Sequence, residues 1–236
     1  SNIVALLGDN SSDWVIVDLA CQQANICLVP IPTFFSLAQI NHLFASLAID
    51  TVICQSTEAF TANPDIEPRS QQTVLGGRFQ LLQIACTGPR NALPEGTQKI
   101  TFTSGSTGQP KGVCLNIAQQ LLQARALATA VALDKPRHLC LLPLSTLLEN
   151  IAGIYTPLMC GGKVMIPSLG EIGFQGSSAL DPQQFCQTIS HYSPDSMILT
   201  PQLLVVAIAA AKQGWEPPES LRFVAVGGGR VSAQLL

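Results

Sequence analysis

A run of glycines and small hydroxyl residues between positions 101 and 112 is the segment of this chain best suited to chemistry. It reads T-F-T-S-G-S-T-G-Q-P-K-G. Glycines let the backbone adopt positive φ and approach a ligand closely, and consecutive N–H groups in such turns form a concavity that binds anions. The hydroxyls add donors and Lys111 adds a positive charge. The segment therefore predicts a phosphate-binding loop, with candidate ligands Thr103, Ser104, Gly105, Ser106, Thr107, Gly108 and Lys111.

Two other interpretations of this loop fit the residues less well. In a Walker A loop the lysine is followed by Ser or Thr, whereas Lys111 follows Pro110, which has no N–H, and precedes Gly112. The next predicted helix also begins several residues later, so a helix N-terminus would not face the phosphates as it does in that loop. A flexible Ser/Gly linker seldom places strand residues, Pro and Lys in this order.

The order T-S-G-S-T-G-x-P-K-G resembles the phosphate-loop signature of adenylate-forming enzymes: acyl-CoA synthetases, nonribosomal-peptide adenylation domains and luciferases. The match is complete over ten consecutive positions. Weaker similarities follow in the family's order at residues 8–31, 142–162 and 221–229, so the resemblance covers nearly the whole chain. The stretch around residues 143–150 resembles long-chain acyl-CoA synthetases more than amino-acid-activating domains. The latter usually present an Asp to the substrate amine, and none can be placed here.

The resemblance implies a carboxylic acid-activating ligase. Such enzymes join ATP and a carboxylate into an acyl-adenylate, release pyrophosphate, and pass the acyl group to a thiol of CoA or of a carrier protein. Fixed dipoles and Mg²⁺ would stabilise the charge that develops on pyrophosphate. The loop need not supply a base, because the acid is already ionised at neutral pH. By resemblance the loop would hold the β- and γ-phosphates of ATP, and the acyl and adenine pocket would include Ser145, Glu149, Asn150, Gly227, Gly228 and Gly229.

Two alternatives stay open within that pocket. Many family members carry a His after the Pro-Leu of the pocket segment, whereas this chain has Ser145. Glu149 and Asn150 would either orient a polar group or cap the helix expected from Ile151. The glycines at 227–229 would either only permit a turn or let the backbone approach adenine or the acyl group.

Strand and helix patterns alternate along the chain and must position these residues. Helices are expected near residues 13–24, 36–47, 116–133, 151–160, 181–191 and 201–212, and short apolar strands between them. This order predicts parallel strands joined by crossover helices. We expect an α/β fold of stacked βα layers with mainly parallel sheets, as in the N-terminal large domain of an adenylate-forming enzyme. Residues 1–98 would form its first part, with loop structure and one strand (79–84) in residues 58–95, and residues 99–236 the phosphate loop and second layer.

Composition excludes several other classes of function. Only 11% of residues are charged and 47% are hydrophobic, against a usual charged share of roughly 25%. The net charge of −3 and dispersed basic residues argue against a nucleic-acid-binding surface. No apolar run reaches the roughly 18 residues of a transmembrane helix. The eight cysteines include no C-x-x-C pair, and the histidines lie near neither such a pair nor one another. Buried thiols in a reduced cytoplasm, and no metal site, are therefore expected.

Three elements of the resembled family should follow residue 236: the Tyr-Gly-x-[Ser/Thr]-Glu segment, the ribose-binding Asp, and the small domain with its catalytic Lys. We therefore expect an incomplete large domain from a fatty acid–CoA ligase, inactive by itself. The alternatives are a non-catalytic nucleotide-binding module and an acyl-loading domain for a carrier protein. Self-association through exposed apolar faces is left open.

Overall fold

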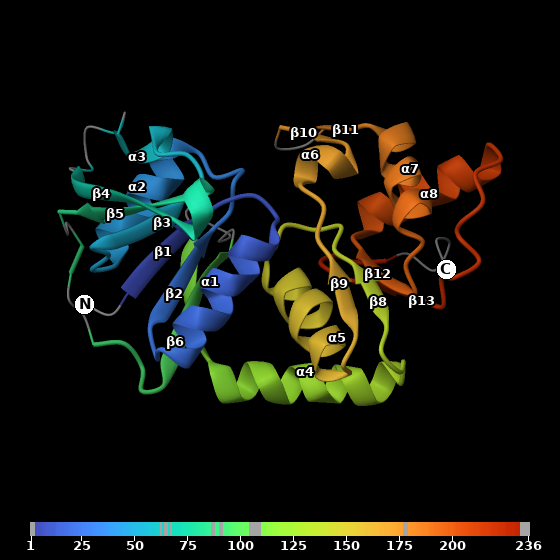
Figure 1. Ribbon diagram of the computed structural model, residues 1–236, viewed down its shortest axis with the longest axis horizontal. Helices are drawn as coiled ribbons and strands as arrows, with labels where there is room; N and C mark the ends of the chain where they lie inside the picture. Colours follow the sequence, from blue (N-terminus) through green and yellow to red (C-terminus); the bar gives the residue numbers. More distant parts are fainter. Residues whose placement is uncertain are drawn as a thin grey trace. The chain divides into compact units, whose positions relative to one another are not determined.

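The chain divides into two compact units, residues 1–120 and 121–236 (Figure 1). The computed structural model describes residues 3–61, 63, 66, 68–85, 88–89, 92–103, 110–176 and 179–231. The division lies further along the chain than the boundary near residue 98 that the sequence suggests. The reason is that the two strands flanking the Gly/Ser loop pair with the first sheet and not with the second.

The first unit contains one seven-stranded sheet in the order β4-β5-β3-β1-β2-β6-β7. The four central strands β3, β1, β2 and β6 are parallel, and β4, β5 and β7 are antiparallel to their neighbours. The α/β expectation is confirmed, with an antiparallel margin at each side. The strands are β1 (Ile3–Leu7), β2 (Cys27–Ile31), β3 (Thr51–Cys54), β4 (Pro68–Val74), β5 (Phe79–Ile84), β6 (Thr97–Thr103) and β7 (Lys111–Asn116).

Two of these strands, β4 and β7, were not predicted. In β4 the first six residues are exposed and the sequence PRSQQTV is polar, so it lacks the apolar alternation by which a half-buried strand is recognised. In β7 the first four residues are exposed. Both occupy sheet edges, where backbone pairing to one neighbour holds a strand that buries little side-chain surface.

The central sheet of the first unit is buried on both faces, as parallel sheets usually are. Alternate residues of its strands, among them Ala5 and Val29, cluster with Leu43 and Phe44 of α2, while Leu6 of the opposite set is also fully buried. The first two helices begin at side-chain caps, Ser11 and Ser36, which bind their first N–H groups. The helical segments of this unit are α1 (Ser12–Gln23), α2 (Leu37–Ser46), α3 (Glu58–Thr61) and the 3₁₀ turn Leu75–Gly77.

A buried ion pair joins α1 to β6. Nζ of Lys99 lies 2.7 Å from Oδ1 of Asp18, with side chains 1% and 0% exposed. Burial lowers the pKa of Lys99, and the Asp18 carboxylate opposes that shift. A charge in such a place needs its partner, because water cannot solvate it. The pair therefore fixes β6, the strand that ends at Thr103, against the first helix.

The second unit contains a four-stranded parallel sheet in the order β13-β12-β8-β9. Its strands are β8 (Arg137–Leu139), β9 (Lys163–Met165), β12 (Ser196–Leu199) and β13 (Phe223–Val226), and a small antiparallel pair comprises β10 (Phe174–Gln175) and β11 (Ala179–Leu180). Phe185 and Ile189 of α7 and Leu203 of α8 are buried in one cluster with Leu139 and Leu199 of the sheet. The helices are α4 (Ile117–Val131), which contains the division, α6 (Leu169–Ile172), α7 (Pro182–Tyr192) and α8 (Pro201–Lys212).

The helix expected over residues 151–160 begins earlier and starts as a π-helix. Its first segment, η2, spans Glu149–Tyr155, and α5 continues over Thr156–Met159. The N–H of Thr156 bonds to the carbonyl of Ile151, five residues back. Pro157 has no N–H to offer the carbonyl of Gly153 four residues before it. The α-helical hydrogen bond between these two residues therefore cannot form, and the wider π-helical turn ends just before Pro157.

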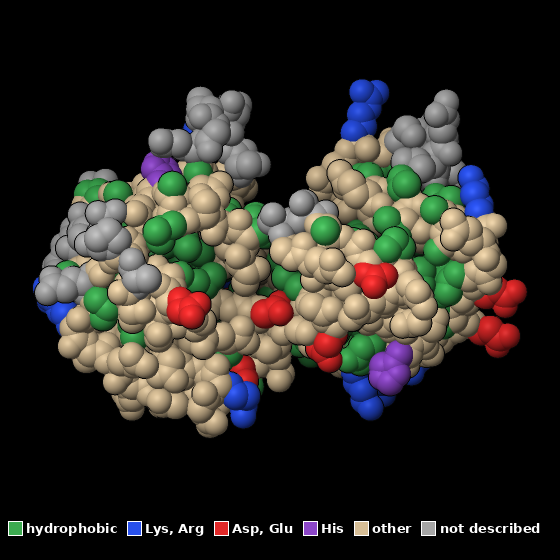
Figure 2. Space-filling model, turned by 90° about the horizontal axis from the view of Figure 1, so that it is seen from above, with side chains coloured by type: hydrophobic (Ala, Val, Ile, Leu, Met, Phe, Trp, Pro, Cys, Tyr) green, Lys and Arg blue, Asp and Glu red, His purple; other side chains and the backbone are tan. Residues whose placement is uncertain are grey.

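Three further observations on the described part of the chain concern the expectations from composition. No helix found there combines the length and apolar character needed to cross a membrane. Cys21, Cys27, Cys54, Cys140 and Cys186 are buried free thiols, as expected, whereas Cys114 is exposed; Cys86 lies outside the described residues. On the face shown in Figure 2, charged side chains lie singly or in small groups and form no large basic patch.

We expect Lys99→Met to lower the free energy of unfolding by about 3–5 kcal/mol, because it leaves the Asp18 carboxylate buried without its partner. Urea denaturation measures this loss. The double variant Asp18→Leu/Lys99→Met removes both charges and is expected to recover most of the lost stability. A single variant as stable as the wild type would show that the pair does not hold α1 to β6.

Candidate functional site

The two ends of the Gly/Ser loop meet at one end of the first sheet. Strands β6 and β7 form an antiparallel pair in which Thr103 is the register partner of Lys111. Both residues are exposed. Since β6 is parallel to β2, Thr103 lies at the carboxyl edge of the sheet, where open α/β sheets bind ligands. Of the predicted phosphate ligands, Ser104, Gly105, Ser106, Thr107 and Gly108 lie outside the described residues.

A hydrogen bond fixes the return side of this loop. The side chain of His42 on α2 donates from Nε2 to the carbonyl oxygen of Pro110, over 3.1 Å. Pro110 itself is buried. The chain thus re-enters the sheet at a set position just before Lys111. The ammonium of Lys111 and the hydroxyl of Thr103 are hydrogen-bond donors suited to phosphate oxygens, and the pairing places them at the same end of the hairpin.

The predicted pocket residues of the second unit lie around the start of the π-helix. The turn before it is closed by Thr146, whose N–H and Oγ1 both donate to the carbonyl of Pro143, at 2.9 and 2.7 Å. Ser145 and Asn150 are 8% and 2% exposed. Neither side chain therefore offers much surface to solvent.

The glycine turn after β13 lies against the same region. The N–H of Gly227 donates to the carbonyl of Leu199, and a Cβ on Gly227 would lie 3.1 Å from Cδ2 of Leu148. Gly228 has φ +77°, in the region that L side chains rarely adopt. The positive φ fits the turn that was one of the two alternatives, and the group that Gly227 approaches closely is the side chain of Leu148. The structure thus brings the segments 145–150 and 227–229 together.

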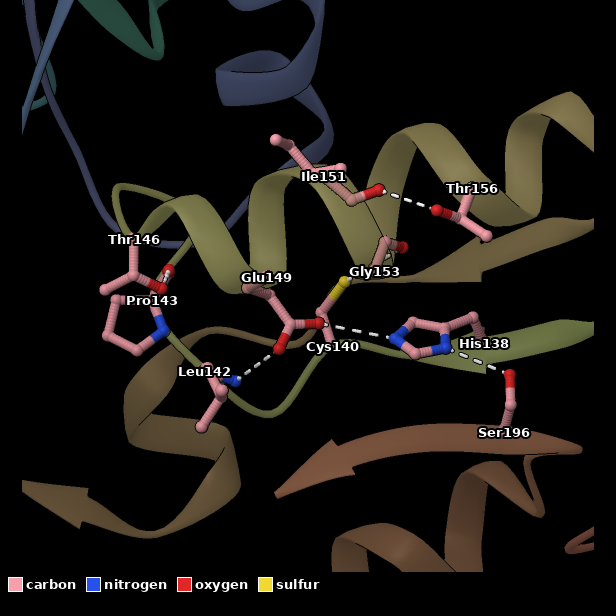
Figure 3. Close-up of polar contacts among 10 residues, drawn as sticks. All are labelled: His138, Cys140, Leu142, Pro143, Thr146, Glu149, Ile151, Gly153, Thr156 and Ser196. Carbon is pink, nitrogen blue, oxygen red and sulfur yellow. Dashed lines mark hydrogen bonds and ion pairs between the residues drawn. The ribbon is translucent and has the colours of Figure 1, made fainter. Parts of the chain in front are cut away.

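The carboxylate of Glu149 is fully buried and points toward β8 (Figure 3). Its Oε1 lies 3.3 Å from Nε2 of His138, and its Oε2 accepts from the N–H of Leu142, also over 3.3 Å. Nδ1 of His138 lies 2.9 Å from Oγ of Ser196. Helix capping by Glu149 or Asn150 is wrong, because the N-cap is Leu148 and no side chain bonds there. Glu149 instead joins the helix to the sheet.

A thiol completes this buried cluster. Sγ of Cys140 donates to the carbonyl of Gly153 over 3.8 Å, and one ligand-type atom from each of His138, Cys140 and Glu149 lies within 4.8 Å of the other two. Burial, followed by the nearby carboxylate, raises the pKa of the Cys140 thiol well above its ordinary value. The thiol is therefore unreactive as a nucleophile at neutral pH.

The sequence offered a signal for this cluster that was not used. His138 and Cys140 are two residues apart at a strand, so their side chains share one face. The apolar run that marks a strand begins only at Leu139, so the apolar pattern leaves the histidine out, whereas β8 begins at Arg137. In the parallel register His138 also faces Ser196 of β12. Glu149 joins the cluster through tertiary packing, so no local sequence pattern indicates that it belongs there.

An apolar cavity of about 80 Å³ lies beside the cluster, within the second unit. Residues of α4, of the π-helix, of α5 and of the sheet line it. His138, Thr156 and Ser196 form its polar part, and its apolar residues include Leu127, Ala128, Ala152, Ile198, Phe223 and Ala225. A larger open groove of about 1020 Å³ lies between α7 and α8, but none of the predicted site residues line it. None of the predicted pocket residues lines the smaller cavity either; its lining residues nearest to them in sequence are Ala152 and Ala225.

Comparison with known proteins gives consistent results. The family described as AMP-binding enzyme matches residues 1–236. The chain is 25% identical over 99% of its length to the PKS-NRPS hybrid synthetase acdB of Aspergillus candidus, and 24% identical over 68% to long-chain-fatty-acid–CoA ligase 5 of Rattus norvegicus. Among solved structures, the anthranilate CoA ligase AuaEII bound to anthranoyl-AMP superposes with a TM-score of 0.77, at 18% identity and 99% coverage of this chain.

The chain spans only part of each of these proteins. It covers 9% of the fungal hybrid synthetase, 28% of the rat ligase and 45% of the anthranilate ligase chain. The chain also matches the FR901469 synthetase and the cyclosporin synthetase simA, and it covers 1% of the length of each. The comparisons establish the fold of an adenylate-forming ligase over the whole chain, and the relatives differ in the acids that their names imply.

Gly153→Ala is expected to destabilise the second unit by about 3 kcal/mol, the upper end for overpacking. A Cβ there would lie 2.2 Å from Oε1 of Glu149 and 3.0 Å from Nε2 of His138. Thermal and urea unfolding measure the effect. The control is Gly170→Ala, where nothing lies within 4 Å of the added methyl; it should be neutral or stabilising by up to about 1 kcal/mol. Equal effects of the two substitutions would contradict the packing around Glu149.

Proposed function

The chain belongs to the family of AMP-binding enzymes, and we propose that it supplies the phosphate loop and part of the acyl pocket of a ligase that activates a carboxylic acid with ATP. The ligase would form an acyl-adenylate and pass the acyl group to a thiol. The observation that carries this proposal is the Thr103–Lys111 pairing, which brings the ends of a complete ten-residue phosphate-loop signature together at the carboxyl edge of the sheet.

The physical task of such a loop is to hold two anions close together. A carboxylate must approach the α-phosphate while charge develops on the departing pyrophosphate. Backbone N–H groups and hydroxyls of residues 103–108, with the ammonium of Lys111, would bind the β- and γ-phosphates and hold them in line. Bound Mg²⁺ would supply further neutralisation of the pyrophosphate charge. The buried Lys99–Asp18 pair ties β6 to α1, so the strand that leads into the loop is held in place before the nucleotide arrives.

For the acid we propose an apolar, fatty-acid-like substrate. The cavity beside the π-helix is almost entirely apolar, and among the described residues that line it none is acidic. An amino acid carries an ammonium, and burying that charge without a carboxylate partner is costly. At about 80 Å³ the cavity is far smaller than the roughly 300–1,000 Å³ of ordinary ligand pockets. It would therefore receive only the end of an acyl chain.

A second candidate function differs from the first in the thiol that accepts the acyl group. An acyl-loading domain for a carrier protein uses the same adenylation step, and similarity to a hybrid synthetase favours it. A ligase that transfers to free CoA is favoured by similarity to a long-chain-fatty-acid–CoA ligase. Supplying the full-length protein with CoA or with a carrier protein as acceptor separates the two.

We expect Lys111→Ala in the full-length protein to lower the rate of ATP–pyrophosphate exchange by about 10²–10³-fold, the usual effect of removing one preorganised donor. The matched control is Lys163→Ala, which removes an exposed lysine of the second sheet and should leave exchange unchanged. Equal rates in both variants would remove Lys111 from the phosphate site. No exchange by the wild type with any acid would favour the non-catalytic nucleotide-binding module.

Ala152→Leu tests the acyl cavity. The larger side chain would fill space beside the π-helix, so kcat/KM for long apolar acids should fall by about 10–200-fold relative to short acids, the range for a change of a methylene or so in an apolar pocket. Ala209→Leu, in the groove between α7 and α8, is the control and should not change chain-length preference. An unchanged preference in Ala152→Leu would show that the acyl chain lies elsewhere.

A further inference from the structure

We propose that His138, Cys140 and Glu149 form a structural zinc site in the core of the second unit. All three residues are buried, and one ligand-type atom from each lies within 4.8 Å of the other two. They come from β8, from the residue that follows it, and from the first position of the π-helix. Imidazole nitrogen, thiolate sulfur and carboxylate oxygen are the ligand types that zinc takes in proteins.

The spacing of the nitrogen and oxygen fits a shared ion. Zinc binds His nitrogen and carboxylate oxygen at about 2.0–2.1 Å in a tetrahedral arrangement, which places two such ligand atoms about 3.3 Å apart. Nε2 of His138 and Oε1 of Glu149 are 3.3 Å apart. As a direct N–H···O hydrogen bond this distance would be long, since such bonds usually measure about 2.7–3.2 Å.

The remaining hydrogen bonds of His138 and Glu149 resemble those that orient zinc ligands in other proteins. A histidine that binds a metal usually has its second ring nitrogen bonded to a polar group, which fixes the ring. Here Nδ1 of His138 lies 2.9 Å from Oγ of Ser196. The second carboxylate oxygen of Glu149 is likewise bound, by the N–H of Leu142. Nε2, Oε1 and Sγ face one another, and a shared cation would replace the contact between Nε2 and Oε1 and the hydrogen bond from Sγ to the carbonyl of Gly153.

Gly153 offers a candidate fourth ligand. The position of its missing Cβ lies 2.2 Å from Oε1 of Glu149 and 3.0 Å from Nε2 of His138, so any side chain at this position would collide with both ligand atoms. Its carbonyl oxygen lies 3.8 Å from Sγ of Cys140. Pro157, four residues later, has no N–H with which to occupy that carbonyl. A small shift of these groups would place four ligands around one ion.

The charges of the proposed site cancel. Zn²⁺ with one thiolate and one carboxylate has no net charge, so it can be buried at far lower cost than an unpaired ion. The ion would connect β8 to the π-helix, and because it binds only the folded chain it would stabilise the second unit. The site includes no residue of the phosphate loop, although His138 also lines the apolar cavity.

The test is the metal content of the untagged 236-residue chain, refolded with equimolar zinc and passed through a desalting column. We expect one zinc per chain by plasma mass spectrometry. X-ray absorption at the zinc edge should show one sulfur at about 2.3 Å and nitrogen or oxygen ligands at about 2.0–2.1 Å. The cobalt-substituted chain should show thiolate charge-transfer absorption in the near ultraviolet. Chelation should lower the melting temperature.

Variants separate this site from adventitious binding. Cys140→Ser should abolish the cobalt charge-transfer band and lower zinc content at least tenfold. Cys160→Ser, at a half-buried thiol beside the neighbouring cavity, should leave both unchanged. Should Cys140→Ser fail to fold, the absorption spectrum of the wild-type chain still decides. A folded wild-type chain without zinc, or zinc bound without a sulfur ligand, would overturn the proposal and leave a hydrogen-bonded triad only.

Discussion

The antiparallel pairing of β6 with β7 is the constraint on which the proposed function of this chain depends. A loop that binds polyphosphate must hold several dipoles and a positive charge in place, because their stabilising effect on developing charge is lost if they must first reorganise. The register partner of Thr103 is Lys111, so the two ends of the signature are held across one strand spacing. The buried Lys99–Asp18 pair on one side and the His42–Pro110 hydrogen bond on the other connect this hairpin to α1 and α2. Strand pairing and buried polar contacts thus set the loop's ends without any contribution from ligand.

Buried polar side chains also hold the elements of the second unit together. Glu149 is a carboxylate with no exposure, and it persists there because a backbone N–H and an imidazole face its two oxygens. The same side chain begins the π-helix, which ends just before Pro157, and it leaves room only for glycine at position 153. The polar cluster of His138, Cys140 and Glu149 therefore positions the π-helix, which borders the apolar cavity. The shape of that cavity follows from the cluster as well as from the apolar side chains around it.

Much of this organisation could be predicted from the sequence, and the exceptions have physical reasons. The alternation of apolar strands and amphipathic helices predicted the parallel core, and the ten-residue signature predicted the family. The edge strands β4 and β7 bury too few side chains to show a pattern. The cluster of His138, Cys140 and Glu149 was missed, and no metal site was expected, because spacing along the chain reveals only ligands that are near in sequence. Glu149 reaches His138 through tertiary packing, which local patterns do not encode.

The most direct test of the central claim is a crystal structure of the full-length protein with a non-hydrolysable ATP analogue and Mg²⁺. We predict that the β- and γ-phosphate oxygens lie within hydrogen-bond distance of backbone N–H groups between residues 104 and 108 and of Nζ of Lys111. A triphosphate bound elsewhere, with this stretch packed against the protein's own side chains and closed to the nucleotide, would contradict the assignment.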